Sequence, residues 1–149
     1  MEERRYGIAV RLDLPLEQAE ARVREALGAE GFGILTEIDV ASTLRQKLGV
    51  DWPPQKILGA CNPQLAHRAL EAEADVGLLL PCNVVVAADG DGTVVSAADP
   101  LAMLGVPGDP ALQPIAAEAR QRLERALRSL EEVASRPQEA SAQASAATA

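Results

Sequence analysis

The chain has 149 residues, with 14 Lys and Arg against 22 Asp and Glu, so its formal net charge is −8, and 48% of the residues are apolar. This length and apolar content indicate one domain with its own core, which we place at residues 1–135. Nucleic acids and anionic membranes bind basic surfaces, so the acidic balance argues against both as partners. No apolar run approaches the roughly 20 residues of a membrane span.

The first half of the chain predicts two strands and two helices. Residues 6–14 alternate in polarity, with Tyr6, Ile8, Val10 and Leu12 on one face of a strand. Apolar residues then recur at helical spacing from Pro15 to Gly28. Residues 31–39 return to alternation, which places Ile34, Thr36 and Ile38 on one side of a second strand, and a short helix follows over residues 41–48.

The second half predicts three more strands and two helices. Residues 56–60 form a strand, and Asn62 and Pro63 cap and begin a helix that ends near residue 74 and buries Leu65, Ala66, Ala69 and Leu70. Residues 78–87 and 93–97 form strands joined by a tight glycine turn over residues 89–92. The longest helix covers residues 115–133, and an Ala- and Ser-rich disordered tail is expected at residues 136–149. This order with its hairpin favours an α+β fold.

Three blocks of the chain resemble the bacterial and archaeal family called domain of unknown function 302. They are Gly31-Phe-Gly-Ile-Leu-Thr-Glu-Ile-Asp-Val40, Lys56-Ile-Leu-Gly-Ala-Cys-Asn-Pro63 and Gly77-Leu-Leu-Leu-Pro-Cys-Asn-Val-Val-Val86. The resemblance implies a curved antiparallel sheet packed by helices, similar in layout to the TATA-binding-protein fold, and a homodimer. It implies no activity, since the family has none assigned, although some members occur beside sulfur-metabolism genes.

The two cysteines are the candidate thiol residues. Cys61 lies where a strand turns into the helix that Asn62 caps, and unpaired amides at a helix start lower the pKa of a thiol. The alternative is a buried cysteine in a tight packing corner. Cys82 follows Pro81 at an apolar strand and has the same two interpretations. If the two meet in space, a dithiol relay or a soft-metal site becomes possible, whereas two sulfurs alone make a weak zinc case.

Polar candidates lie near the same strand ends. Glu37 and Asp39 share one face of a strand, which suits a cation or acid and base duties, but Asp39 also suits a helix cap and Glu37 a solvated face. Asn62 and Asn83 each follow a cysteine. His67 is the sole histidine, and we expect it at the surface beside Glu71.

These residues lead to three hypotheses on function, of which the third is a purely structural dimer with the apolar hairpin as its interface. The first is a non-catalytic accessory module, a homodimer whose cleft presents Asn62, Asn83, Glu37 and the cysteines to a small molecule or protein. The second is a thiol-based sulfur carrier or redox protein that uses Cys61, with Cys82 as a second site. The common enzyme signatures are absent, so we expect no catalytic residues, no metal and no cofactor. The start of the chain lacks the order of a signal peptide, and with free thiols this favours the cytoplasm.

Overall fold

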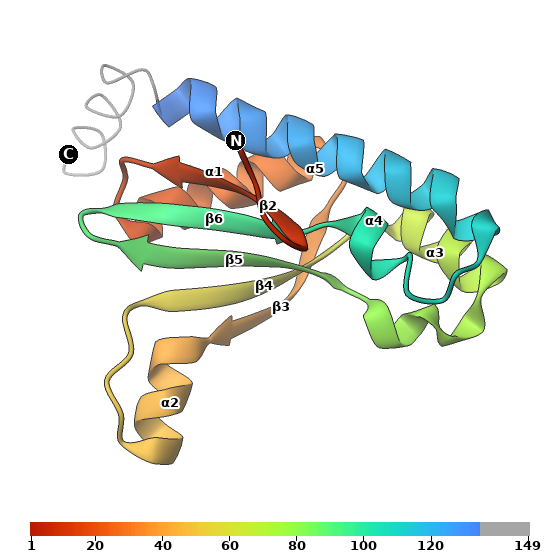
Figure 1. Cartoon of the computed structure of the whole chain (residues 1–149). Coiled ribbons are helices and arrows are strands. Elements are labelled where there is room, and N and C mark those ends of the chain that lie inside the picture. Colours follow the sequence, from red (N-terminus) through yellow and green to blue (C-terminus); the bar gives the residue numbers. More distant parts are fainter. Residues whose placement is uncertain (135–149) are drawn as a thin grey trace.

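The computed structural model describes residues 1–134, and the tail predicted for residues 136–149 lies outside them. Six strands form one antiparallel sheet in the order β1-β2-β6-β5-β4-β3 (Figure 1). The strands are β1 (Glu2–Glu3), β2 (Gly7–Leu12), β3 (Gly33–Asp39), β4 (Gln55–Cys61), β5 (Cys82–Asp89) and β6 (Gly92–Ala98). The α-helices are α1 (Leu16–Ala29), α2 (Val40–Leu48), α3 (Pro63–Ala72), α4 (Pro100–Met103) and α5 (Gln113–Ala134), and the 3-10 helices are η1 (Ala74–Leu79) and η2 (Pro110–Leu112).

One face of the sheet is packed by α1 and α5, which lie together on it in Figure 1. Leu58, Val84, Ala97 and Ile8 form a cross-strand row on this face through four neighbouring strands, and all four are fully buried. The helices contribute apolar side chains at helical spacing to the same cluster: Ala19, Val23, Leu27, Leu123, Ala126 and Leu127. The main core therefore lies between this face and the two long helices.

The other face of the sheet carries a second cross-strand row. Successive residues of a strand point to opposite faces, so this row lies one residue along each strand from a core-facing position. Ile38, Ile57, Val85 and Ser96 follow one another across β3, β4, β5 and β6, and all of them remain partly or largely exposed. Helix α2 contacts β3 and β4 and buries none of its own residues. We call this row the open face.

A smaller apolar cluster lies beyond the ends of β4 and β5. It joins α3, η1, α4, η2 and the first turns of α5 through Leu65, Ala69, Val76, Leu104, Leu112, Ile115, Ala116 and Ala119. These segments are far apart in the sequence, yet they close over one end of the sheet (Figure 1). The space between the two clusters is where the cysteines lie.

The expected α+β fold, with its antiparallel sheet packed by helices, its β5–β6 hairpin and its long C-terminal helix, is confirmed. The strand predicted to begin at residue 78 begins instead at Cys82. Residues 74–79 form η1, and Leu79 and Leu80 pack against the smaller cluster. An apolar run by itself does not distinguish a strand from a short buried helix.

Three predictions of side-chain placement are also wrong. Tyr6 precedes β2 and is 69% exposed, and Leu70 on α3 is 43% exposed. In β3 the pairing with β4 shifts between Ile34 and Thr36, so Ile34 packs toward the main core while Thr36 faces the other side. Such a bulge inserts a residue and breaks the two-residue alternation on which the prediction relied. Within residues 1–134, no helix combines the length and apolar character that a bilayer crossing demands.

Candidate functional site

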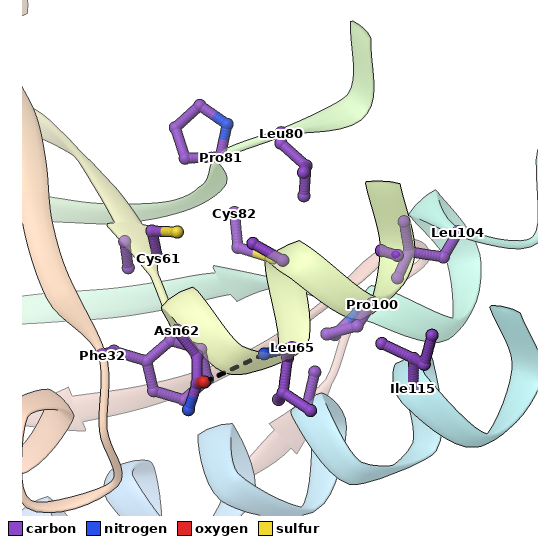
Figure 2. A pocket seen from close by; sticks show the side chains of 14 residues that line it. Phe32, Cys61, Asn62, Leu65, Leu80, Pro81, Cys82, Pro100, Leu104 and Ile115 are labelled. Carbon is purple, nitrogen blue, oxygen red and sulfur yellow. Dashed lines mark hydrogen bonds between the residues drawn. The ribbon is translucent and has the colours of Figure 1, made fainter. Parts of the chain in front are cut away.

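Cys61 and Cys82 lie in the wall of one small cavity between the two apolar clusters (Figure 2). Cys61 ends β4 and Cys82 begins β5, where its cross-strand partner is Ala60, the residue before Cys61. The cavity has a volume of ≈ 30 Å³. We call it the thiol pocket, and its lining consists of Phe32, Ala60, Cys61, Asn62, Leu65, Ala66, Ala69, Leu80, Pro81, Cys82, Pro100, Leu104, Ile115 and Ala119.

Close backbone packing at Gly59 positions the strand ends. A Cβ at Gly59 would lie 2.1 Å from Thr36 Oγ1 and 2.9 Å from Pro81 Cγ, so both side chains occupy the space that a larger residue would need. The Leu80–Pro81 peptide bond is cis, and both residues line the thiol pocket. The glycine of the Lys56–Pro63 block therefore allows β3 and the segment before β5 to close on β4.

Asn62 fixes the start of α3 beside Cys61. Its Oδ1 accepts a hydrogen bond from the Leu65 amide at 3.2 Å, which confirms the predicted cap, and its Nδ2 donates to the Glu30 carbonyl at 3.4 Å (Figure 2). Pro63 occupies the first turn, where no amide hydrogen is needed. Asn62 thus lines the pocket with both ends of its amide engaged in holding α3.

Burial raises the pKa of both thiols. For Cys61, burial shifts the pKa upward. For Cys82, the pKa rises to about 11, with burial as the main cause and the neighbouring Cys61 as a smaller one. The lowered pKa expected for Cys61 at the helix start is therefore wrong. The Leu65 amide donates to the Asn62 side chain and the Ala66 amide donates to the Asn62 carbonyl. The apolar pocket wall also keeps water from the Cys61 sulfur, which disfavours the thiolate.

Glu37 lies away from the thiol pocket, in an ion-pair cluster between α1 and the edge of the sheet. Its carboxylate is 2.8 Å from Lys56 Nζ and 2.9 Å from Arg24 Nη2, and Lys56 Nζ is also 2.9 Å from Glu20. The hydrogen bond from Lys56 lowers the pKa of Glu37. Asp39 accepts a hydrogen bond from the Ser42 amide, so it serves as the predicted cap of α2.

Asn83 is exposed on β5, paired with Gly59 across the strands. Since successive residues of a strand point to opposite faces, Asn83 and Cys82 lie on different sides of the sheet. The single cleft predicted to hold Asn62, Asn83, Glu37 and both cysteines is not formed. The structure brings together Cys61, Asn62 and Cys82 only.

The sole histidine is at the surface, as predicted. His67 Nε2 is 3.0 Å from Glu71 one turn along α3, and both side chains are exposed. The predicted glycine turn is a two-residue hairpin connection in which Gly90 has φ 61°.

A wider groove of ≈ 340 Å³ lies between α2, the start of α1 and β4. Its polar side chains already have partners: Asp39 caps α2, Lys56 holds Glu20 and Glu37, and Arg45 pairs with Asp51. The groove therefore offers a ligand few polar groups that are not already engaged.

Across residues 1–134, no three His, Cys, Asp or Glu side chains gather closely enough to hold a metal ion together. Sequence reasoning selected the two thiols but missed the wall that encloses them, which includes Phe32, Pro100, Leu104 and Ile115. Those residues come from segments distant in the chain, so their spacing along the sequence does not show that they share one wall.

Comparison with known proteins places the chain in a family. The model described as "Domain of unknown function DUF302" matches residues 8–130. A solved structure, the uncharacterized conserved protein DUF302 from Bacillus stearothermophilus, is 35% identical with a TM-score of 0.77, and the match covers 83% of this chain and 97% of that one. No curated protein matches the sequence. With most of its length matched by the family model and by a solved member, the chain belongs to the DUF302 family.

Proposed function

We propose that the chain is a non-catalytic binding module whose binding element is the thiol pocket. The observation that carries this proposal is the composition of the pocket wall, in which two thiols and one amide are the only polar side chains contributed by residues 1–134. General acid and base catalysis needs a carboxylate, imidazole, amine or phenol within reach of the reacting atoms, and the described part of the chain contributes none of these to the pocket wall.

The volume of the pocket limits the size of the ligand. Sites for metabolites are typically about 300–1,000 Å³, and about 10–15 Å³ already accommodates one water molecule. At ≈ 30 Å³ the thiol pocket has room for one or a few atoms. The cargo of the module is therefore an ion or an atom-sized group held by sulfur. Free thiols suit the reducing environment of the cytoplasm, where we place the module.

Native mass spectrometry tests the binding function directly. The reduced full-length chain, incubated without oxygen in the small-molecule fraction of a cell extract, should retain an adduct of only a few atoms. The matched Cys61→Ser/Cys82→Ser variant should show the mass of the bare chain. An adduct of metabolite size, or one that the double variant retains, would contradict the assignment, as would the absence of any adduct.

A sulfur carrier is the second candidate function, supported by the presence of both cysteines in one pocket. Sulfur transfer requires Cys61 to attack as a thiolate. The raised pKa of Cys61 opposes this at neutral pH, so we rank this function below the first. In the same spectra it predicts an adduct with the mass of one sulfur atom, lost in Cys61→Ser.

We also propose that two copies of the chain pair through the open face. Antiparallel sheets that face water usually present polar residues, whereas Ile38, Ile57 and Val85 form an apolar cross-strand row here. Ile38 is 48% exposed, and Trp52, beyond the adjacent helix α2, is 50% exposed. Contiguous exposed apolar surface marks interaction sites, and a face that pairs with its own copy closes into a two-fold dimer.

The dimer predicts a definite result for a charge on the open face. Val85→Asp should convert the wild-type dimer into a monomer in sedimentation equilibrium, because a two-fold contact buries the carboxylate twice. The matched control is Leu78→Asp, which changes an 87% exposed leucine of η1 away from the open face and should remain dimeric. A monomeric wild type, or dissociation by Leu78→Asp alone, would contradict this interface.

A further inference from the structure

Within residues 1–134 the thiol pocket offers two thiols, and its one other polar side chain, Asn62, already has its amide oxygen engaged by the Leu65 amide. Both cysteines come from strand ends that are neighbours in the sheet, and the remaining wall is apolar apart from the amide of Asn62. Figure 2 shows both thiol side chains among the residues that line the pocket, above the start of α3. Because no third His, Cys, Asp or Glu joins them in residues 1–134, a metal ion here would have two protein ligands.

This ligand set distinguishes between classes of metal ion. Structural zinc takes four ligands, and calcium and magnesium take six or more oxygens, so the pocket suits none of them. Thiolates select soft ions, and a d¹⁰ univalent ion such as Cu(I) is stable with two sulfur ligands alone. The apolar wall gives no hydrogen-bond partners to the water ligands that harder ions retain, because the one side-chain amide in it, that of Asn62, is already engaged.

We propose that the thiol pocket binds one soft univalent cation of the Cu(I) class between Cys61 Sγ and Cys82 Sγ. The inference rests on the proposed binding function and names the ligand class. Binding forms two metal–sulfur bonds and breaks two S–H bonds. Both protons leave to solvent, the metal keeps its oxidation state, and the site changes from neutral to a net charge of −1.

The fold offers partial compensation for that charge. Helix α3 begins at Pro63, two residues after Cys61, and the amino-terminal end of a helix carries a partial positive charge. Asn62 holds that end against the pocket through its bond to the Leu65 amide. The Cys61 thiolate thus lies next to the favourable pole of α3.

Anaerobic competition with a chromophoric Cu(I) chelator, bathocuproine disulfonate, tests the inference on the reduced full-length chain. The wild type should withdraw one equivalent of Cu(I), and Cys61→Ser and Cys82→Ser should each weaken binding at least ~100-fold, because each leaves one thiolate ligand where two are needed. Zn(II) should bind far more weakly. Copper X-ray absorption should show two sulfur neighbours and no nitrogen or oxygen.

Matched controls use the other metal-binding side chains of the chain. His67→Ala removes the sole histidine, which is exposed on α3, and Met103→Leu removes a thioether that does not line the pocket. Both variants should bind Cu(I) like the wild type. A loss in either control as large as that in Cys82→Ser would place the ion elsewhere and overturn the inference.

A variant-free measurement covers the case in which the serine variants fold poorly. One equivalent of Cu(I) should protect both cysteines of the wild type from alkylation together. Reactivity of either cysteine that is unchanged by Cu(I) would overturn the inference. No Cu(I) uptake together with a different atom-sized adduct in native mass spectrometry would reject the metal and keep the binding function, whereas no uptake and no adduct would reject both.

Discussion

At neutral pH, iodoacetamide should alkylate Cys82 in the native protein about 100-fold more slowly than in the unfolded chain. Burial raises the pKa of Cys82 from 9.0 to about 11, and only the thiolate is nucleophilic, so each pKa unit reduces the reactive fraction about tenfold. The native rate should rise about tenfold per pH unit up to pH 11. In the unfolded chain the rate should level off above about pH 9.

Mass spectrometry of both modified peptides over a pH series measures these rates. Cys61 should also react more slowly than its unfolded form, since burial shifts its pKa in the same direction. The control is Cys61→Ser, in which the rate at Cys82 should change little, because Cys61 is only the smaller cause of the shift. Rapid alkylation of native Cys61 at pH 7 would instead favour the sulfur carrier.

A methyl group at Gly59 should destabilise the protein by about 1–3 kcal/mol, the usual range for forcing extra volume into a packed site. Glycine within a strand is ordinarily less favourable than alanine, so a Gly→Ala change in a strand usually raises the free energy of unfolding. At Gly59 we expect the opposite, a lower free energy of unfolding. Here the added Cβ would lie 2.1 Å from Thr36 Oγ1 and 2.9 Å from Pro81 Cγ. Urea unfolding followed by circular dichroism gives the free energy of unfolding.

Gly33→Ala is the matched control for Gly59→Ala, because Gly33 lies in the neighbouring strand β3 and a Cβ there meets nothing within 4 Å. It should leave the free energy of unfolding nearly unchanged. Adding Thr36→Ala to Gly59→Ala should recover part of the loss, since the nearest contact disappears while that with Pro81 remains. Equal stability of the two glycine variants would show that Gly59 is not a close-approach position.

Local signals in the sequence determined much of the fold. Apolar residues at helical spacing define α1 and α5, Asn62 and Asp39 have the side chains that cap α3 and α2, and the glycine turn joins β5 to β6. These signals act between residues a few positions apart, so spacing along the chain reveals them. The three family blocks were also recognisable in the sequence. The family model and the solved member confirm that the chain belongs to the DUF302 family.

Only the tertiary structure decided which candidate residues share a site. Cys61 and Cys82 line one pocket where β4 ends and β5 begins. Glu37 instead pairs with Lys56 and Arg24, and Asn83 points to the opposite side of the sheet from Cys82. The direction of the thiol pKa shifts also depends on walls supplied by distant segments, including Phe32 and Ile115. Strand order and desolvation arise from long-range packing, which the spacing of residues along a single chain does not encode.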